Sequence, residues 1–300
     1  MFLSRGGNVE LVVVPNSVED ISFYQEKESN IFVLGLENYC INYPSVSLDE
    51  IKKLSSKYSL FISVNKNIFN NELTDLTEKL VELSHLSIRG VLFYDLGVLN
   101  IVRENNISLN LVWHQTHMVT NYNTCNFYYE KGVSSGFLAN EITLDEILEI
   151  KKRTKMKLMV ECFGYPIMSH SRRMLLTNYF KSIGKKKENR VYHLENMNED
   201  YLLKESSDGA SILYGKLING VKPLFDLVEN DIDYVDLDMQ EVDKSIGKEV
   251  LTTYSNIIRN YASITEKEKD SIINRMNNLI GDSTNFFYKR TIYKVKKGDK

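Results

Sequence analysis

The stretch KLMVECFGYPIMSHSRRMLLTNYF, residues 157–180, decides the fold of this chain. It opens with an apolar run from Lys157 to Phe163, which predicts a buried strand, and a Gly-Tyr-Pro break follows. Polar and cationic side chains then crowd the segment from Met168 to Arg173, and a helix is expected to follow Met168. In parallel α/β proteins ligands bind just beyond the carboxyl ends of the strands. The stretch therefore predicts a parallel α/β protein with a site at this end.

Short apolar runs like the first part of this stretch alternate with helical patterns along the chain. Most are continuous rather than alternating, as expected for strands buried on both faces. The predicted strands are Val9–Val14, Asn30–Leu36, Leu60–Val64, Gly90–Tyr94, Asn110–Trp113, Gly136–Ala139, Leu158–Phe163 and Tyr234–Met239. About eight strands with helices between them predict an α/β fold of the (β/α)8 type, a TIM-barrel-like architecture or a close variant.

Helix starts and one interruption complete the predicted layout. Ser47 with Glu50, and Thr143 with Glu146, have the spacing of a capping box, and residues 72–86 carry leucines on one helical stripe. Residues 181–214 break the repeat and predict an inserted hairpin or small β-layer beside the barrel mouth. Residues 242–262 and 266–280 predict C-terminal helices. We expect one barrel domain over residues 1–284 and a basic tail over 285–300.

Composition limits the classes of function. The 300 residues are 43% hydrophobic with a net charge of −3, so nucleic-acid contacts would rest on local patches such as residues 185–190 and 289–297. No apolar run approaches the roughly 18 residues of a membrane span, and no signal-peptide pattern opens the chain, so a cytoplasmic protein without membrane contacts is expected. Cys40, Cys125 and Cys162 are too few for a four-cysteine iron–sulfur cluster, and no cofactor motif occurs.

Polar residues at the predicted strand ends should converge on one barrel mouth. Amide and carboxylate groups there would suit a small polar ligand or a nucleobase, although such residues also often cap the next helix. The ring consists of Glu37, Asn38, Asn65, Asp95, His114, Gln115, Asn140, Glu141, Glu161 and Asp236 or Asp238.

The spacing of residues in the sequence bears on three kinds of site near the mouth: a metal site, a Ser–His pair and an anion site. The histidines show no metal-binding spacing, so no metal site is predicted. Ser169 and Ser171 flank His170, but chain neighbours do not generally form a nucleophile–base pair, and no G-x-S-x-G elbow is present. Arg172 and Arg173 would suit a phosphate or a ligand carboxylate; the alternative is an ion pair with Glu141 or Glu161.

Three blocks of sequence, taken in order, resemble the peptidase U32 family, also called collagenase-like proteases. The first is Gly90–Leu99, a strand followed by an Asp-x-Gly turn. The second comprises His114-Gln115, Thr120-Asn121, residues 130–133 and residues 138–141. The third is the opening stretch, which resembles the family signature region through Gly164, Met168, Ser171, Arg172, Arg173, Leu175, Leu176 and Asn178. The resemblance covers roughly residues 30–240.

The departures from the family pattern are informative. Iron–sulfur members place cysteines in and after the signature region, where this chain has Ile167, Met174 and a cysteine-free segment over residues 181–190. Asn140 stands where the family has Arg, and a late Lys-Ile-(Glu/Asp)-Gly block is replaced by residues 235–239. The chain thus resembles the short, cluster-free members, for which the resemblance implies a partner subunit in 5-hydroxyuridine formation at the tRNA wobble position.

The polar residues at the barrel mouth and the family resemblance together lead to predictions for the site and for the partners. No metal and no cofactor are expected in this chain, whereas a U32 paralogue carrying the iron–sulfur cysteines and tRNA are expected partners. The alternatives are a peptidase, as the family name implies, and a non-catalytic partner of the paralogue. The predicted catalytic residues are Glu141, Glu161 and His170, and the predicted substrate-binding residues are Asn65, Asp95, His114, Gln115, Asn121, Tyr165, Arg172 and Arg173.

Overall fold

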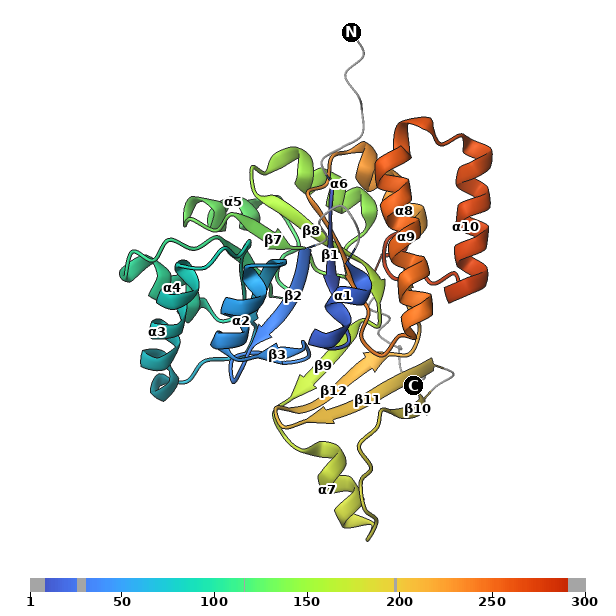
Figure 1. Ribbon diagram of the computed structural model, residues 1–300. Coiled ribbons are helices and arrows are strands. Elements are labelled where there is room, and N and C mark those ends of the chain that lie inside the picture. Colours follow the sequence, from blue (N-terminus) through green and yellow to red (C-terminus); the bar gives the residue numbers. More distant parts are fainter. Residues whose placement is uncertain (1–8, 26–30, 116, 197–198, 291–300) are drawn as a thin grey trace, which may run out of the picture.

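The computed structural model describes residues 9–25, 31–115, 117–196 and 199–290 (Figure 1). The predicted residues 291–300 of the basic tail lie outside the described part of the chain. No helix within these ranges is long and apolar enough to cross a membrane.

Eight parallel strands close into a barrel, as predicted. Each pairs with its neighbour in parallel, and β14 returns to pair with β1, which also pairs with β2. The barrel strands are β1 (Glu10–Val14), β2 (Ile31–Leu36), β4 (Ser59–Val64), β5 (Gly90–Phe93), β6 (Leu111–Trp113), β7 (Ser135–Phe137), β8 (Lys157–Gly164) and β14 (Tyr234–Asp238).

Helices surround this barrel and follow the local signals of the sequence (Figure 1). Both predicted capping boxes are present, at Ser47 with Glu50 and at Thr143 with Glu146. The helices of the barrel layer and of the C-terminal region are α1 (Ile21–Tyr24), α2 (Leu48–Ser55), α3 (Leu73–Ser84), α4 (Leu96–Glu104), α5 (Tyr122–Glu130), α6 (Leu144–Arg153), α8 (Val221–Glu229), α9 (Lys244–Asn260) and α10 (Glu266–Ile280).

The barrel interior is an apolar plug, separate from the larger core between strands and helices. Side chains alternate along a strand, so every second residue points inward. The plug contains Val112 of β6, Met159 of β8 and Tyr234 of β14, all buried. Continuing the same alternation toward the carboxyl ends, the next inward positions are His114, Glu161 and Asp236. Polar groups therefore lie directly above an apolar floor.

A four-stranded antiparallel sheet interrupts the repeat after β8, in the order β10-β11-β12-β9 (Figure 1). It confirms the expected β-layer, but it begins earlier than residue 181. The prediction of a helix directly after Met168 was wrong, because residues 167–171 form a strand that pairs with residues about 40 positions later in the sequence. Its elements are β9 (Ile167–Ser171), α7 (Leu175–Ser182), β10 (Tyr192–Asn196), β11 (Glu199–Ser206) and β12 (Gly209–Tyr214).

The segment that follows α10 packs back onto the barrel. Phe287 is buried in the main core, and its carbonyl accepts a 2.9 Å hydrogen bond from the backbone N–H of Leu144, the first residue of α6. The Asn285 side chain donates to the carbonyl of Asn140, which follows β7. Residues just beyond the predicted boundary at 284 therefore help to form the wall of the barrel mouth.

Candidate functional site

A cavity of about 1090 Å³ opens at the carboxyl ends of the barrel strands. Its walls come from parts of the chain that are far apart in sequence: the loop after β2, the ends of β8 and β14, the strand β9, and the segment after α10. The position is the one where parallel barrels carry their ligand chemistry. We therefore take this cavity as the candidate functional site.

Three carboxyl groups gather at the floor of the cavity. Glu161 and Asp236 are direct partners in the parallel pairing of β8 with β14, and Asp238 lies one inward position further along β14. Burial raises the pKa of Glu161 to about 7, although the Asn140 side chain donates a hydrogen bond to it, and Asp238 nearby raises it further. Burial also raises the pKa of Asp238 to about 6 and that of Asp236 well above its ordinary value.

Neutral aromatic groups stand beside these acids. His114 is 7% exposed, and burial lowers its pKa to about 4, so its imidazole is uncharged at neutral pH. Its ring stacks on Phe137, with ring centres 4.4 Å apart, and the ring centre of Tyr43 lies 6.2 Å from that of His114. Asn65 holds the Tyr43 loop, because its side chain accepts from the N–H of Ile41 at 2.8 Å and donates to the Ile41 carbonyl at 3.0 Å.

Strand β9 brings His170 to the cavity through a short hydrogen-bond chain. The Nδ1 atom of His170 lies 2.8 Å from the hydroxyl of Ser211, and that hydroxyl donates to the Asn42 side chain at 2.8 Å. Burial lowers the pKa of His170. Ser169 and Ser171 lie on the face of β9 opposite to His170, because neighbouring strand residues alternate. Neither of these two serines is therefore placed to form with His170 the pair that a serine peptidase needs.

Three polar atoms of the cavity lining are buried yet have no hydrogen-bond partner among the residues that the structure describes. They are Nδ1 of His114, Oδ1 of Asp236 and Nε2 of His170. Unsatisfied buried polar atoms are rare in native proteins, and each costs about 1–3 kcal/mol. Their convergence on one cavity is typical of a site shaped to bind a polar ligand.

Most of the residues predicted from sequence line this cavity. Glu141 is half-exposed at its edge and forms a 3.3 Å ion pair with His117 when the imidazole is protonated. Among the residues that the structure describes, no acid forms an ion pair with Arg172, and its guanidinium lies 4.4 Å from the ring centre of Phe69. The predicted residues that line the cavity are Asn65, His114, Glu141, Glu161, Tyr165, His170 and Arg172.

Four predicted residues lie elsewhere. Asp95 caps α4 through the N–H of Gly97 and also accepts from the N–H of Ile68. Gln115 accepts from the Trp113 indole and donates to the Tyr94 carbonyl. Asn121 caps α5, and Arg173 is exposed on the insertion. Three of these side chains thus serve the local structure, as polar residues after strands often do.

Some cavity residues were not selected from the sequence. Asp236 and Asp238 belonged to the predicted polar ring but were not chosen as site residues. Both point inward on β14, and the alternation of side chains along that strand would have identified them. Tyr43 comes from a loop and carries no periodic signal, so only the tertiary structure places it above the barrel plug.

The cysteines do not fit the cluster that other members of the resembling family carry. Cys40, Cys125 and Cys162 are free and buried, on the loop after β2, on α5 and on β8. Burial raises the pKa of each thiol, to about 12 for Cys40 and about 11 for Cys125, which favours the thiol over the metal-binding thiolate. With only three cysteines, the chain cannot supply four thiolate ligands.

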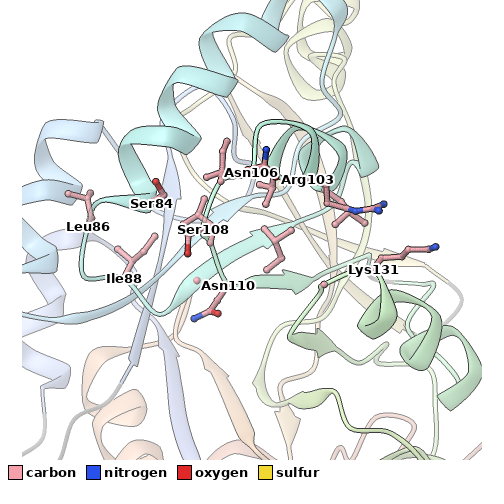
Figure 2. A pocket seen from close by; sticks show the side chains of 15 residues that line it. Ser84, Leu86, Ile88, Arg103, Asn106, Ser108, Asn110 and Lys131 are labelled. Carbon is pink, nitrogen blue, oxygen red and sulfur yellow. The ribbon is translucent and has the colours of Figure 1, made fainter.

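A second cavity, of about 550 Å³, lies at the opposite end of the barrel (Figure 2). Gly90 and Leu111, the first residues of β5 and β6, contribute to its wall, together with the ends of α3, α4 and α5. Figure 2 shows Arg103 and Lys131 among its side chains. In parallel barrels this end serves stability rather than chemistry, so we place the site at the other mouth.

Fold and site define a (β/α)8 barrel protein with an inserted β-layer and a buried, acid-lined mouth. The chain belongs to peptidase family U32, whose model matches residues 33–296. It is 27% identical to tRNA hydroxylation protein P2 of Bacillus subtilis, over 95% of this chain and 99% of that protein.

Two further relatives are matched over part of their length. tRNA hydroxylation protein P1 of Bacillus subtilis is 25% identical over 71% of this chain and 50% of that protein. tRNA hydroxylation protein P of Haemophilus influenzae is 25% identical over 45% of this chain and 29% of that protein. Of these three relatives, only P2 aligns with this chain from end to end.

Proposed function

We propose that this chain is a subunit for hydroxylation of the wobble uridine of tRNA. The alignment with tRNA hydroxylation protein P2 over 99% of that protein carries the proposal, because it includes both the barrel and the inserted β-layer. A peptidase role has no comparable support: the hydroxyl nearest to His170 is that of Ser211, which is 2% exposed and already bonded to Asn42.

The chemistry of the cavity supports a uracil base as its ligand. Uracil is a neutral planar ring with an acceptor, a donor and an acceptor along one edge. A raised pKa favours the protonated form of a carboxyl group, which can both donate and accept a hydrogen bond, and a neutral imidazole can do the same. The stacked His114 and Phe137 rings and the Tyr43 ring offer faces for a planar ligand. A base reaches such a pocket only when it is unstacked, as anticodon-loop bases readily are.

Glu161 is the group best suited to move a proton. Its pKa of about 7 lies near the working pH, where a carboxyl group can serve as acid or base, and Asn140 fixes the position of one of its oxygens. Asp236 and His114 would hold the base, and His170, oriented by Ser211, would present its Nε2 atom to it. These roles rest on geometry and charge state.

The missing cysteines support a division of labour with a paralogue. We propose that the iron–sulfur chemistry resides in a second U32 protein and that this chain carries no cluster. Two proteins named for tRNA hydroxylation, P1 and P2, come from one organism, which is consistent with paired paralogues.

Deletion of the gene, followed by mass spectrometry of tRNA nucleosides, tests this function. We expect 5-hydroxyuridine and its derivatives to fall sharply and to be restored by a plasmid copy. A copy with Asp236→Leu should fail to restore them, because the leucine side chain is similar in size but can neither donate nor accept a hydrogen bond to the base. A copy with Glu130→Gln, an exposed change at the end of α5, is the matched control and should restore them. Unchanged hydroxylation in the deletion strain would overturn the proposal.

A further inference from the structure

Residues 172–190, here called the α7 arm, carry a charge opposite to that of the chain. The segment has seven Lys or Arg residues and one Glu, a net charge of +6. Since the whole chain has a net charge of −3, the remaining residues sum to −9. Such asymmetry is the electrostatic signature of a surface for a polyanion.

The cations of the arm are largely unneutralised. Arg173, Lys181, Lys185 and Lys186 are exposed and have no ion-pair partner within the described ranges. Lys187 pairs with Glu205 at 3.5 Å, and Arg190 pairs with Glu188 at 2.7 Å. Four positive charges are therefore presented to solvent from one short segment.

The arm is held in place although α7 buries none of its own residues. The Glu205 side chain, from β11, accepts hydrogen bonds from the N–H groups of Leu176 and Thr177 at the start of the helix. Further along, Phe180 packs against Tyr192 of β10, with ring centres 5.0 Å apart. Figure 1 shows α7 at the outer end of the β-layer, away from the barrel. A charged element that is fixed and projects in this way is suited to an extended partner.

The arm also begins at the candidate site. Arg172, its first residue, lines the cavity, and the lining also includes Lys289 together with Lys66 and Lys216, which pair with Glu72 and Glu199. A polyanion that reaches the cavity would thus pass from cations of the lining to cations of the arm. Leu175, Tyr179 and Ile183 are exposed at a spacing of four residues, and Tyr179 is 57% exposed. This stripe alone would suit a protein partner, but the net charge of +6 favours nucleic acid.

We propose that the α7 arm binds the phosphate backbone of tRNA while one base of that tRNA occupies the cavity. The inference deepens the proposed function and rests on it for the identity of the RNA. Phosphate contacts of this kind position an RNA without reading its sequence, whereas the cavity would select the base.

Direct binding to unmodified tRNA transcript tests the arm. The variant Lys181→Gln, Lys185→Gln, Lys186→Gln removes three exposed charges. The matched control is Lys53→Gln, Lys57→Gln, Lys267→Gln, which makes the same charge change at exposed sites on α2, in the turn after it, and on α10. Each lost phosphate contact reduces the slope of log affinity against log salt concentration by slightly less than one. For the arm variant we therefore expect a slope shallower by about 2 to 3 and an affinity about tenfold weaker near physiological salt.

Fluorescence anisotropy of labelled tRNA across a salt series measures both quantities. Equal slopes and affinities for the two variants would overturn the inference. If the arm variant instead keeps tRNA binding but loses complex formation with a co-expressed U32 paralogue in size-exclusion chromatography, the arm is a protein interface and the inference is wrong. Arm-dependent tRNA binding together with unchanged hydroxylation in the deletion strain would support the arm and overturn only the proposed function.

Discussion

The Glu161→Gln variant is expected to be more stable than the natural protein at pH 8 and yet to be unable to support tRNA hydroxylation. Glutamine keeps the shape of the side chain and can still accept the hydrogen bond from Asn140. It cannot ionise, so it removes the cost of a buried negative charge next to Asp236 and Asp238. The same change removes the group that we propose moves the proton.

The direction of the pH effect follows from the raised pKa. Glu161 has a pKa of about 7 in the folded protein against 4.5 as its ordinary value, so between these values the folded state holds a proton that the unfolded state has lost. Unfolding then releases that proton, and the free energy of unfolding falls as the pH rises through this window. One pKa unit corresponds to 1.36 kcal/mol, so a shift from 4.5 to about 7 gives an expected gain of about 3 kcal/mol for the variant at pH 8.

Urea denaturation at pH 5 and pH 8, followed by circular dichroism, measures this difference. The natural protein should lose more stability between the two pH values than the Glu161→Gln variant does. Glu130→Gln serves as control, because Glu130 is exposed and its substitution should leave the pH dependence as it is. An identical pH dependence in all three proteins would contradict the assignment of a raised pKa to Glu161.

Substitution of Gly209 by alanine is expected to open the inserted β-layer while the barrel stays folded. Gly209 has φ +127°, and a Cβ there would lie 2.0 Å from the carbonyl oxygen of Ser171 and 2.8 Å from the Cα of Arg172. Both contacts are with backbone, which cannot swing aside as a side chain does. Clash and strain together are expected to cost about 3 kcal/mol or more.

The consequences should extend to the site and to the α7 arm. The pairing of β9 with β12 aligns Ser211 with His170 and anchors the root of the arm, so its loss would release both. Hydrogen exchange read by mass spectrometry should show faster exchange in peptides from β9 and β12 and unchanged exchange in β4 to β6. Binding of tRNA should weaken at the same time.

Gly132→Ala provides the matched control for this experiment. Gly132 also has a positive φ, of +93°, but a Cβ there would meet nothing within 4 Å. It should cost only about 1 kcal/mol and leave exchange in the β-layer unchanged. If the two variants show the same exchange in β9 and β12, the close approach at Gly209 is not what holds the β-layer together.

The barrel itself could be predicted from the sequence because its signals are local. Continuous apolar runs mark the strands, and capping boxes such as Thr143 with Glu146 mark helix starts, so neither needs information from distant residues. The strand β9 escaped prediction for the opposite reason. Its residues become a strand only through pairing with Ala210 to Leu213, which no local pattern announces.

The residues of the candidate site likewise differ in whether local sequence signals could predict them. His114 and Glu161 could be chosen in advance because each lies at the end of a buried strand. Neighbouring strand residues point to opposite faces, so only one of His114 and Gln115 can enter the cavity, but the sequence could not tell which one. The structure places His114 in the cavity and bonds Gln115 to Trp113. Tyr43 reaches the site from a loop whose position depends on Asn65.

The sequence by itself determined the eight-stranded α/β barrel, the end at which its candidate site was expected, and the impossibility of a four-cysteine cluster within this chain. Only the tertiary structure decided which polar side chains meet, because closure of the barrel brings β8 beside β14 and places Glu161 opposite Asp236. Burial in that closed mouth raises the pKa values of the acids and lowers that of His114, and the identity of these residues in the sequence does not reveal this burial.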